Sequence, residues 1–135
     1  NMKLTFQQIH GAIEALKSLS EEKLPFRLSL LFSKNLSILE KEEQFYIEQE
    51  RKFATTYLEI DPKTGEFLQT EPGVFHIKEG KQAECAEARK DLDNFTSDVA
   101  VRLIPESDLE KIDFTIKQLN NLQFIIAEEN KTEEE

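Results

Sequence analysis

The chain has 135 residues, of which 39% are hydrophobic and 33% are charged, and its formal net charge is −10. This length fits one domain, and four Gly and four Pro are too few for many short strands and turns, so the composition favours helices. The acidic balance, with no long run of Lys or Arg, argues against direct binding of nucleic acid or of an anionic membrane.

The first predicted helix begins after Leu4 and ends near residues 18–20. Thr5 can cap it and Gln8 can reach back to Thr5, which is the pattern of a capping box, while Leu4 and Ile9 occupy the positions of a hydrophobic staple. Three- and four-residue spacing predicts one apolar face, made of Phe6, Ile9, Ile13, Leu16 and Leu19.

A long second helix is predicted from Pro25 to about Leu58, because neither Gly nor another Pro interrupts these residues. Such a helix would span about 50 Å. Apolar residues seven apart form one stripe along it, namely Phe32, Leu39, Tyr46 and Phe53. The companion positions are either Leu36, Glu43, Glu50 and Tyr57 or Asn35, Glu42, Gln49 and Thr56. Either way, charged or polar residues interrupt the second stripe in its middle.

The start of the long helix is apolar and its second half is rich in Glu, so three interpretations arise. A membrane anchor is disfavoured, because Arg27 and Lys34 interrupt an apolar segment that is too short to span a bilayer. A core helix is favoured, and a partner-facing surface is the alternative. Glu42, Glu43, Gln49 and Glu50 flank Tyr46, so we expect its ring to be largely exposed in a single chain. The candidate interaction surface consists of Leu39, Tyr46, Phe53 and Tyr57.

The middle of the chain holds turn signals and a third helix. Asp61-Pro62 and Pro72-Gly73 indicate turns around a strand-like segment at 74–77, which forms either a small hairpin or an irregular excursion. Residues 82–95 are predicted to be helical, with one face made of Cys85, Ala88, Leu92 and Phe95.

The C-terminal part begins with an alternating segment at 99–104 that predicts a half-buried strand ended by Pro105. Ser107 with Glu110 predicts a second capping box, and Thr115 with Gln118 a third, at the start of the last helix. The expected apolar face of that helix is Ile116, Leu119, Leu122 (or Gln123) and Ile126. Residues 4–9 and 114–119 share a pattern, which is either one common cap used twice or two short strands that lead into neighbouring helices.

The residues that carry chemistry are few. His10, His76 and Cys85 cannot build the usual structural zinc sites, and the single cysteine excludes an intramolecular disulfide and indicates a reducing compartment. A Cys85–His76 dyad is conceivable, although a small buried cysteine on a helix face is the simpler interpretation. No glycine loop for phosphate and no calcium loop is present. We predict no enzyme activity, no catalytic residue, no cofactor and no metal.

Three parts of the sequence together resemble a family of small, uncharacterised phage and prophage proteins of Gram-positive bacteria. They are residues 4–8, the Leu24-Pro25 start of the long helix with charges such as Lys23 and Glu42 around it, and residues 101–105 through Phe114-Thr115. The likeness covers most of the chain. It implies a virus-encoded protein in the host cytoplasm or associated with the virion, and the family has no assigned activity. We expect Met2 to be the natural start, without a signal peptide.

The predicted fold is mainly α with minor β: a long central helix packed by three shorter helices, with a small β element. We predict one domain over 2–129 and a disordered acidic tail at 130–135. The predicted function is a non-enzymatic interaction protein, an assembly factor or minor structural component that self-associates through a protein interface. It would contact neither nucleic acid nor membrane. The alternative is an acidic inhibitor that mimics nucleic acid to block a host protein.

Overall fold

The computed structural model describes residues 1–128, so the predicted tail at 130–135 lies outside the described residues. The chain divides into two compact units. Unit 1 contains Asn1–Glu43 and the part of the chain from Thr96 onward, and unit 2 is Gln44–Phe95. The single domain over 2–129 stays a prediction.

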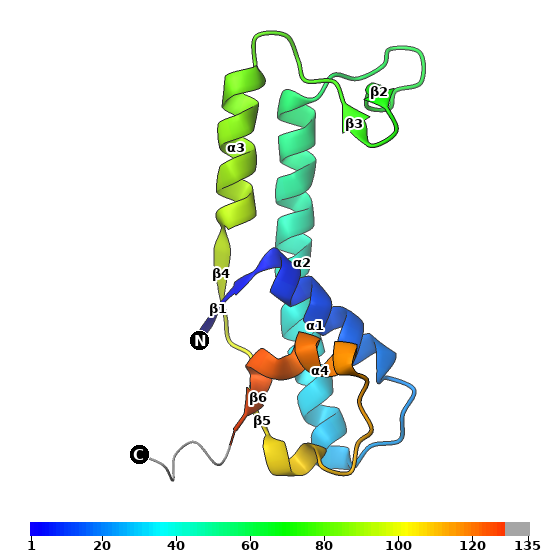
Figure 1. The fold of residues 1–135 in the computed structure, drawn as a ribbon, viewed down its shortest axis with the longest axis vertical. Coiled ribbons are helices and arrows are strands. Elements are labelled where there is room, and N and C mark those ends of the chain that lie inside the picture. The colour runs from blue at the N-terminus through cyan, green and yellow to red at the C-terminus, as the bar shows by residue number, and fades with distance from the viewer. Residues whose placement is uncertain (129–135) are drawn as a thin grey trace. The chain divides into compact units, whose positions relative to one another are not determined.

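The fold is mainly helical with small strands, as predicted (Figure 1). The long helix α2 (Phe26–Tyr57) begins directly after Pro25 and ends within one residue of the predicted Leu58. The shorter helices are α1 (Phe6–Ser18), α3 (Gln82–Asn94) and α4 (Ile116–Leu122). The strands are β1 (Met2–Thr5), β2 (Gln69–Glu71), β3 (Val74–Phe75), β4 (Thr96–Val99), β5 (Ile104–Pro105) and β6 (Ile126–Ala127), and two 3-10 helices are η1 (Glu106–Leu109) and η2 (Gln123–Ile125).

The predicted capping box of α1 is confirmed. Gln8 donates its backbone N–H to Oγ1 of Thr5 at 3.2 Å, and Thr5 donates its backbone N–H to Oε1 of Gln8 at 2.9 Å. These two bonds satisfy donors that the first turn of a helix leaves without an intrahelical partner. Strand β1 leads into this cap and pairs antiparallel with β4, with Leu4 opposite Ser97.

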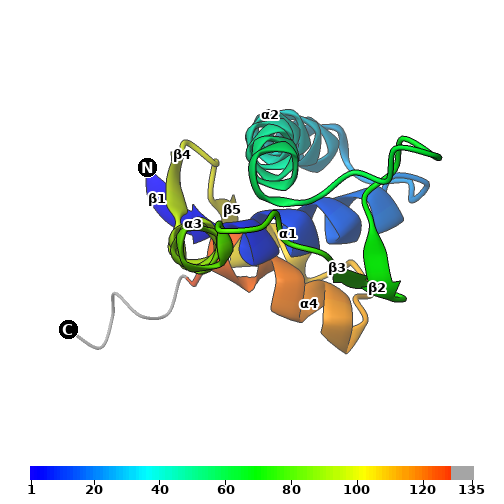
Figure 2. The ribbon, with the colours of Figure 1, turned by 90° about the horizontal axis from the view of Figure 1, so that it is seen from above.

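Helices α1 and α4 pack side by side in unit 1 (Figure 2). A Cβ on Gly11 would lie 2.8 Å from Oδ1 of Asn121, so the missing side chain permits the close approach. Near the other end of the contact, Nε2 of Gln118 donates to Oγ of Ser18 at 2.9 Å. The two segments with a shared pattern therefore do lead into neighbouring helices, but only the first is preceded by a strand, since residues 113–115 are not one.

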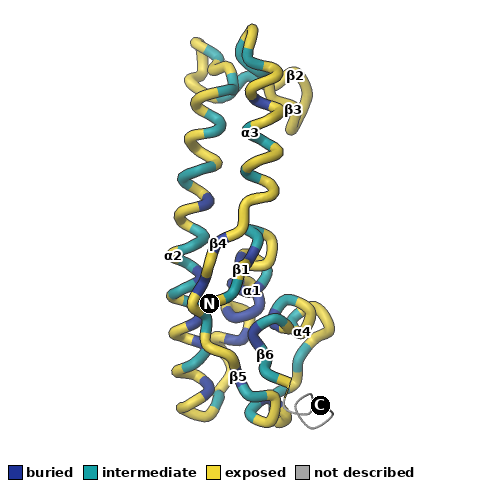
Figure 3. The backbone as a smooth tube through the Cα atoms, turned by 90° about the vertical axis from the view of Figure 1, so that its left-hand side faces the viewer, coloured by how far each residue is buried: buried dark blue, intermediate teal, exposed yellow. Residues whose placement is uncertain are grey.

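The core of unit 1 combines one face of α1 with one face of the first half of α2. Ile9, Ile13, Leu16 and Leu19 are buried as predicted, and Phe6 is half-buried. On α2 the buried positions recur every three or four residues, and they appear as separate dark-blue segments along that part of the tube in Figure 3. They are Leu28, Phe32, Asn35 and Leu39. Of the two companion positions left open by the sequence, Asn35 is therefore buried, whereas Leu36 is half-buried.

The predicted strand at 99–104 is wrong in its extent. β4 ends at Val99 and β5 begins at Ile104, so residues 100–103 are not strand. The backbone of Arg102 instead hydrogen bonds to the side chain of Asn35, whose Nδ2 donates to the Arg102 carbonyl at 2.9 Å and whose Oδ1 accepts from its N–H at 2.8 Å. A buried side chain thus takes the place of a neighbouring strand, which alternation along the sequence cannot reveal.

The capping box predicted at Ser107 needs correction. The turn at Ser107 is the 3-10 helix η1, which begins at Glu106 with Pro105 as its N-cap, and it is not opened by a capping box of Ser107 and Glu110. The turn therefore begins two residues earlier than a cap at Ser107 would place it, directly after Pro105, whose φ is fixed by its ring. The Thr115–Gln118 capping box, by contrast, is confirmed, with bonds of 3.0 Å and 2.9 Å.

The apolar face predicted for the last helix is also partly wrong. Ile116 is 79% exposed and Leu119 is 42% exposed, whereas Leu122 and Ile125 are buried. Helix α4 ends at Leu122 and continues as η2, which has three residues per turn, so Ile125 rather than Ile126 turns into the core. The first turn of α4 therefore presents two apolar side chains, Ile116 and Leu119, to solvent.

Unit 2 contains the second half of α2, a small β hairpin and α3. The predicted turn at Pro72-Gly73 joins β2 to β3 in an antiparallel hairpin, which decides between the two predicted alternatives. Isolated bridges between Leu58 and Ile77 and between Ile60 and Phe67 extend the pairing toward α2. Lys78 adds a hydrogen bond of 2.9 Å from Nζ to the Thr55 carbonyl, so the hairpin is attached to the last turn of α2.

A candidate interaction groove in unit 2

Helix α3 forms because residues 82–94 contain neither Gly nor Pro and include three Ala, so nothing in this segment breaks a helix. The helix ends at Phe95, whose backbone is extended and whose N–H bonds to the Leu92 carbonyl. On its inner side Cys85 is buried, and Ala88 and Leu92 are half-buried. The predicted face of α3 is thus confirmed for these three residues.

Arg89 ties α3 to α2. Its guanidinium donates to Glu50 on α2, with Nη1 3.0 Å from Oε2, and to Asp93 on its own helix, with Nε 3.0 Å from Oδ1. Its Cζ lies 4.6 Å from the centre of the Phe53 ring, within range of a cation–π contact. The hydrogen bond with Glu50 raises the pKa of Arg89 above its ordinary value, so the group stays charged. This clamp fixes the spacing of the two helices on one side.

A groove with a volume of 380 Å³ runs between the two helices within unit 2. Its apolar lining is Phe45, Phe53, Tyr57, Ala88, Leu92 and Phe95, and its polar lining is Gln49, Lys52, Thr56 and Asp91. We call these ten residues the hairpin groove, after the pair of helices α2 and α3; no residue of the β hairpin is among them. The rings of Phe53 and Tyr57 lie 5.4 Å apart and those of Phe45 and Phe95 lie 6.1 Å apart. Phe45 and Phe95 are each 44% exposed, so apolar surface faces solvent in the single chain.

The four residues of the predicted interaction surface do not lie together. Phe53 and Tyr57 line the hairpin groove and are half-buried. Leu39 belongs to the core of unit 1 and is fully buried. The expectation that Tyr46 is exposed in a single chain is wrong, because the residue is only 2% exposed. Its hydroxyl donates to the Phe95 carbonyl at 3.1 Å, and its ring packs edge-on against that of Phe95.

Sequence reasoning missed Phe45 and Phe95 as interaction residues. Phe45 lies one position before the seven-residue stripe, so counting by sevens passes over it. A signal was present nonetheless, because Phe45, Gln49, Lys52, Phe53 and Thr56 follow the spacing of one helix face. On α3 the same holds for Ala88, Asp91, Leu92 and Phe95.

The predicted chemical candidates lie apart from this groove or are occupied by other partners. His76 pairs with Glu59 at 2.7 Å, and Cys85 is buried. His10 in unit 1 lies between Glu43 and Glu14, at 2.8 Å and 3.0 Å. Across residues 1–128, no group of His, Cys, Asp and Glu side chains has an arrangement that could hold a metal ion. The absence of enzyme activity stays a prediction.

Within the same residues, no helix combines the length and the apolar character that crossing a bilayer requires. No protein-family model, curated protein or solved structure matches the chain. The resemblance to phage and prophage proteins therefore stays a prediction.

Proposed function

We propose that the chain is a phage- or prophage-encoded interaction protein, an assembly factor or minor structural component, that self-associates through the hairpin groove. The viral origin rests on the sequence resemblance alone. The observation that carries the interaction is the groove, which is lined by two half-exposed phenylalanines, Phe45 on α2 and Phe95 directly after α3. Aromatic side chains of this kind supply much of the binding energy at protein interfaces.

A second copy of the same chain is the occupant that the charges favour. The described residues of the lining include one cation, Lys52 on α2, and one anion, Asp91 on α3. A two-fold axis repeats every contact between the two copies. If Lys52 of one copy faces Asp91 of the other, the same pair therefore forms a second time with the roles of the copies exchanged. Among residues 1–128 neither side chain forms an ion pair within the chain. Because the groove is small, we expect a dimer that dissociates on dilution.

Light scattering on a dilution series tests the dimer. The wild type should show a mass above 15.7 kDa at high concentration and should approach that value on dilution. Phe45→Ser should shift the dimer dissociation constant upward by about tenfold or more, because burying an aromatic side chain contributes roughly 1.5–3 kcal/mol. Phe75→Ser is the matched control: Phe75 is 42% exposed, belongs to the β hairpin of unit 2 and does not line the groove. Equal behaviour of the two variants, or a wild type that stays at the single-chain mass, would contradict the proposal.

A charge exchange tests the symmetry of the dimer. Lys52→Glu and Asp91→Lys should each weaken association, because each places like charges against one another. The double variant should restore the wild-type dissociation constant if the two residues meet across the interface. Circular dichroism on all three variants separates loss of association from loss of helix. A double variant weaker than both single variants would argue against this pairing.

A further inference from the structure

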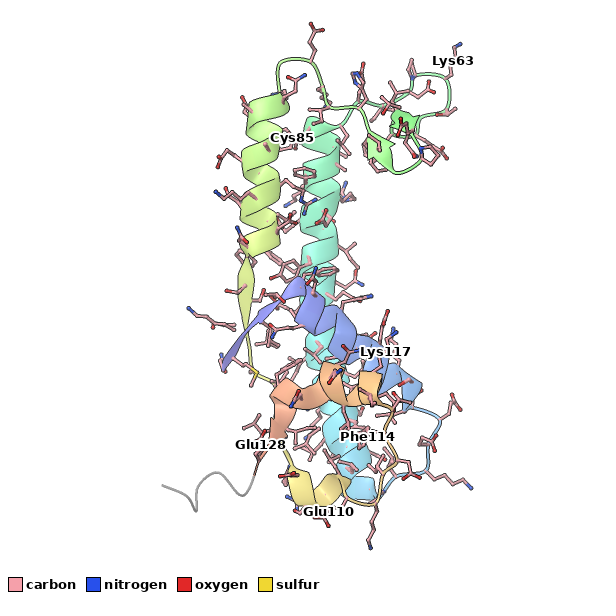
Figure 4. The ribbon with its side chains drawn as sticks, in the orientation of Figure 1. Lys63, Cys85, Glu110, Phe114, Lys117 and Glu128 are labelled. Atoms are coloured by element: carbon pink, nitrogen blue, oxygen red, sulfur yellow. The ribbon has the colours of Figure 1, made fainter. Side chains whose placement is uncertain are left out.

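Unit 1 carries a second groove whose chemistry differs from that of the hairpin groove. It has a volume of 550 Å³ and lies between η1 and the segment from α4 to the end of β6. Figure 4 labels three residues around it, namely Glu110, Phe114 and Glu128. Its lining within residues 1–128 is Glu106, Leu109, Glu110, Phe114, Leu119, Asn120, Gln123, Ile126 and Glu128, which we call the acidic groove.

The floor of the acidic groove is apolar and its rim is anionic. Leu109 is buried, Phe114 and Ile126 are half-buried, and Leu119 is 42% exposed. The three glutamates of the lining are exposed, and none of the described lining residues is a Lys or Arg. A ligand in this groove therefore meets apolar surface beneath it and negative charge around it.

Helix α4 extends the apolar floor beyond the groove. Ile116 precedes Leu119 by three residues, so both lie on one face of the helix. Ile116 is 79% exposed, although the spacing of this face is that of a helix side that packs against a core. Among the described residues, none covers this face of α4, so its apolar side chains remain exposed. Such a face is typical of a helix that packs against a partner.

We propose that the acidic groove and the adjoining face of α4 bind an amphipathic basic segment of a partner protein. Apolar side chains of the segment would contact Leu119 and Ile116, and its Lys or Arg side chains would face Glu106, Glu110 and Glu128. The charge also selects among occupants. The residues that follow Glu128 contain four Glu and one Lys, so they do not complement the groove, and a second copy of a chain with net charge −10 complements it poorly. The proposal concerns unit 1 and does not depend on the hairpin groove.

The test uses a defined peptide and the full chain. The probe is a fluorescein-labelled amphipathic peptide of Leu and Lys with about 15 residues, which spans about 22 Å as a helix. Fluorescence anisotropy should show binding that weakens as salt is added, because the rim charges are exposed. A peptide with every Lys replaced by Glu should not bind. Failure of the Leu–Lys peptide to bind, or equal binding of the two peptides, would overturn the proposal.

Matched variants locate the binding. The triple variant Glu106→Gln, Glu110→Gln, Glu128→Gln should weaken binding about tenfold, whereas Glu21→Gln, Glu79→Gln, Glu87→Gln should stay within about twofold. Both change the net charge by the same amount, and the control glutamates are exposed and outside the groove. Equal weakening by the two triples would show that only overall charge matters and would overturn the proposal.

Two apolar variants test the floor. Leu119→Ser and Ile116→Ser should each weaken binding about tenfold, the loss expected for a central apolar anchor. Leu103→Ser is the control, since Leu103 is 52% exposed in unit 1 and does not line the groove. Ile116→Ser keeps the test valid if circular dichroism shows that Leu119→Ser disturbs the helix. Unchanged binding by both variants would overturn the proposal.

Two other results would overturn it by identifying the occupant as the chain itself. One is peptide binding that occurs only after deletion of residues 129–135. The other is a loss of self-association in Leu119→Ser.

Discussion

Asn35 is a polar residue on an otherwise apolar face of α2. It is fully buried, and both polar atoms of its amide are bonded to the backbone of Arg102, 67 positions away in the sequence. A buried amide is tolerated only when its hydrogen bonds are made, because leaving a buried donor or acceptor unpaired costs more than one bond contributes. This single side chain therefore fixes where residues 100–103 run.

We expect Asn35→Ala to lower the free energy of unfolding by about 2 to 3 kcal/mol, since it removes both partners of the Arg102 backbone and leaves a small void. Urea unfolding followed by circular dichroism measures the change. Asn94→Ala, at the exposed end of α3, is the control and should stay within about 0.5 kcal/mol of the wild type. If the two variants unfold at the same urea concentration, the amide does not have the role given to it.

At the scale of elements, the two capping boxes should have separable effects. Thr5→Ala and Thr115→Ala should each lower the free energy of unfolding by roughly 1 kcal/mol, because each removes an acceptor for a backbone N–H in the first helical turn. Thr5→Ser and Thr115→Ser keep that oxygen and should recover most of the loss. Melts in which the Ala and Ser variants coincide would show that the hydroxyls contribute nothing.

The same elements show which features are visible in the sequence. The caps of α1 and α4 and the extent of α2 follow from residues within a few positions of one another, and all were predicted. The break at 100–103 depends on Asn35, and the exposure of Ile116 depends on which elements pack on α4. Neither is encoded by local spacing. Phe53 lies on the predicted stripe of residues seven apart and Tyr57 lies at a companion position, and both positions can be read from local spacing. The burial of Tyr46 instead depends on Phe95, 49 positions away.

At the scale of the whole molecule, acidic residues outnumber basic ones by ten, yet nearby cations and histidines bind several of the carboxylates. His10 is one such group, held between Glu43 on α2 and Glu14 on its own helix and stacked on Phe6 with the ring centres 5.8 Å apart. The hydrogen bond with Glu43, together with the charges of both carboxylates, raises the pKa of His10 above its ordinary value of 6.5. Within unit 1, His10 thus links α1 to α2 through an ion pair that requires a protonated imidazole.

This linkage predicts how stability changes between about pH 6 and pH 8, where ordinary carboxylates remain ionised. Because the pKa of His10 is higher in the folded chain than in the unfolded one, its contribution is complete below pH 6.5 and is lost as the pH rises through the folded value. The urea midpoint should therefore fall as the pH increases. His10 is 51% exposed, so screening limits the effect to less than about 1 kcal/mol. His10→Gln and Glu43→Gln should each flatten this part of the pH profile, and a profile unchanged in both variants would show that the pair does not stabilise the fold.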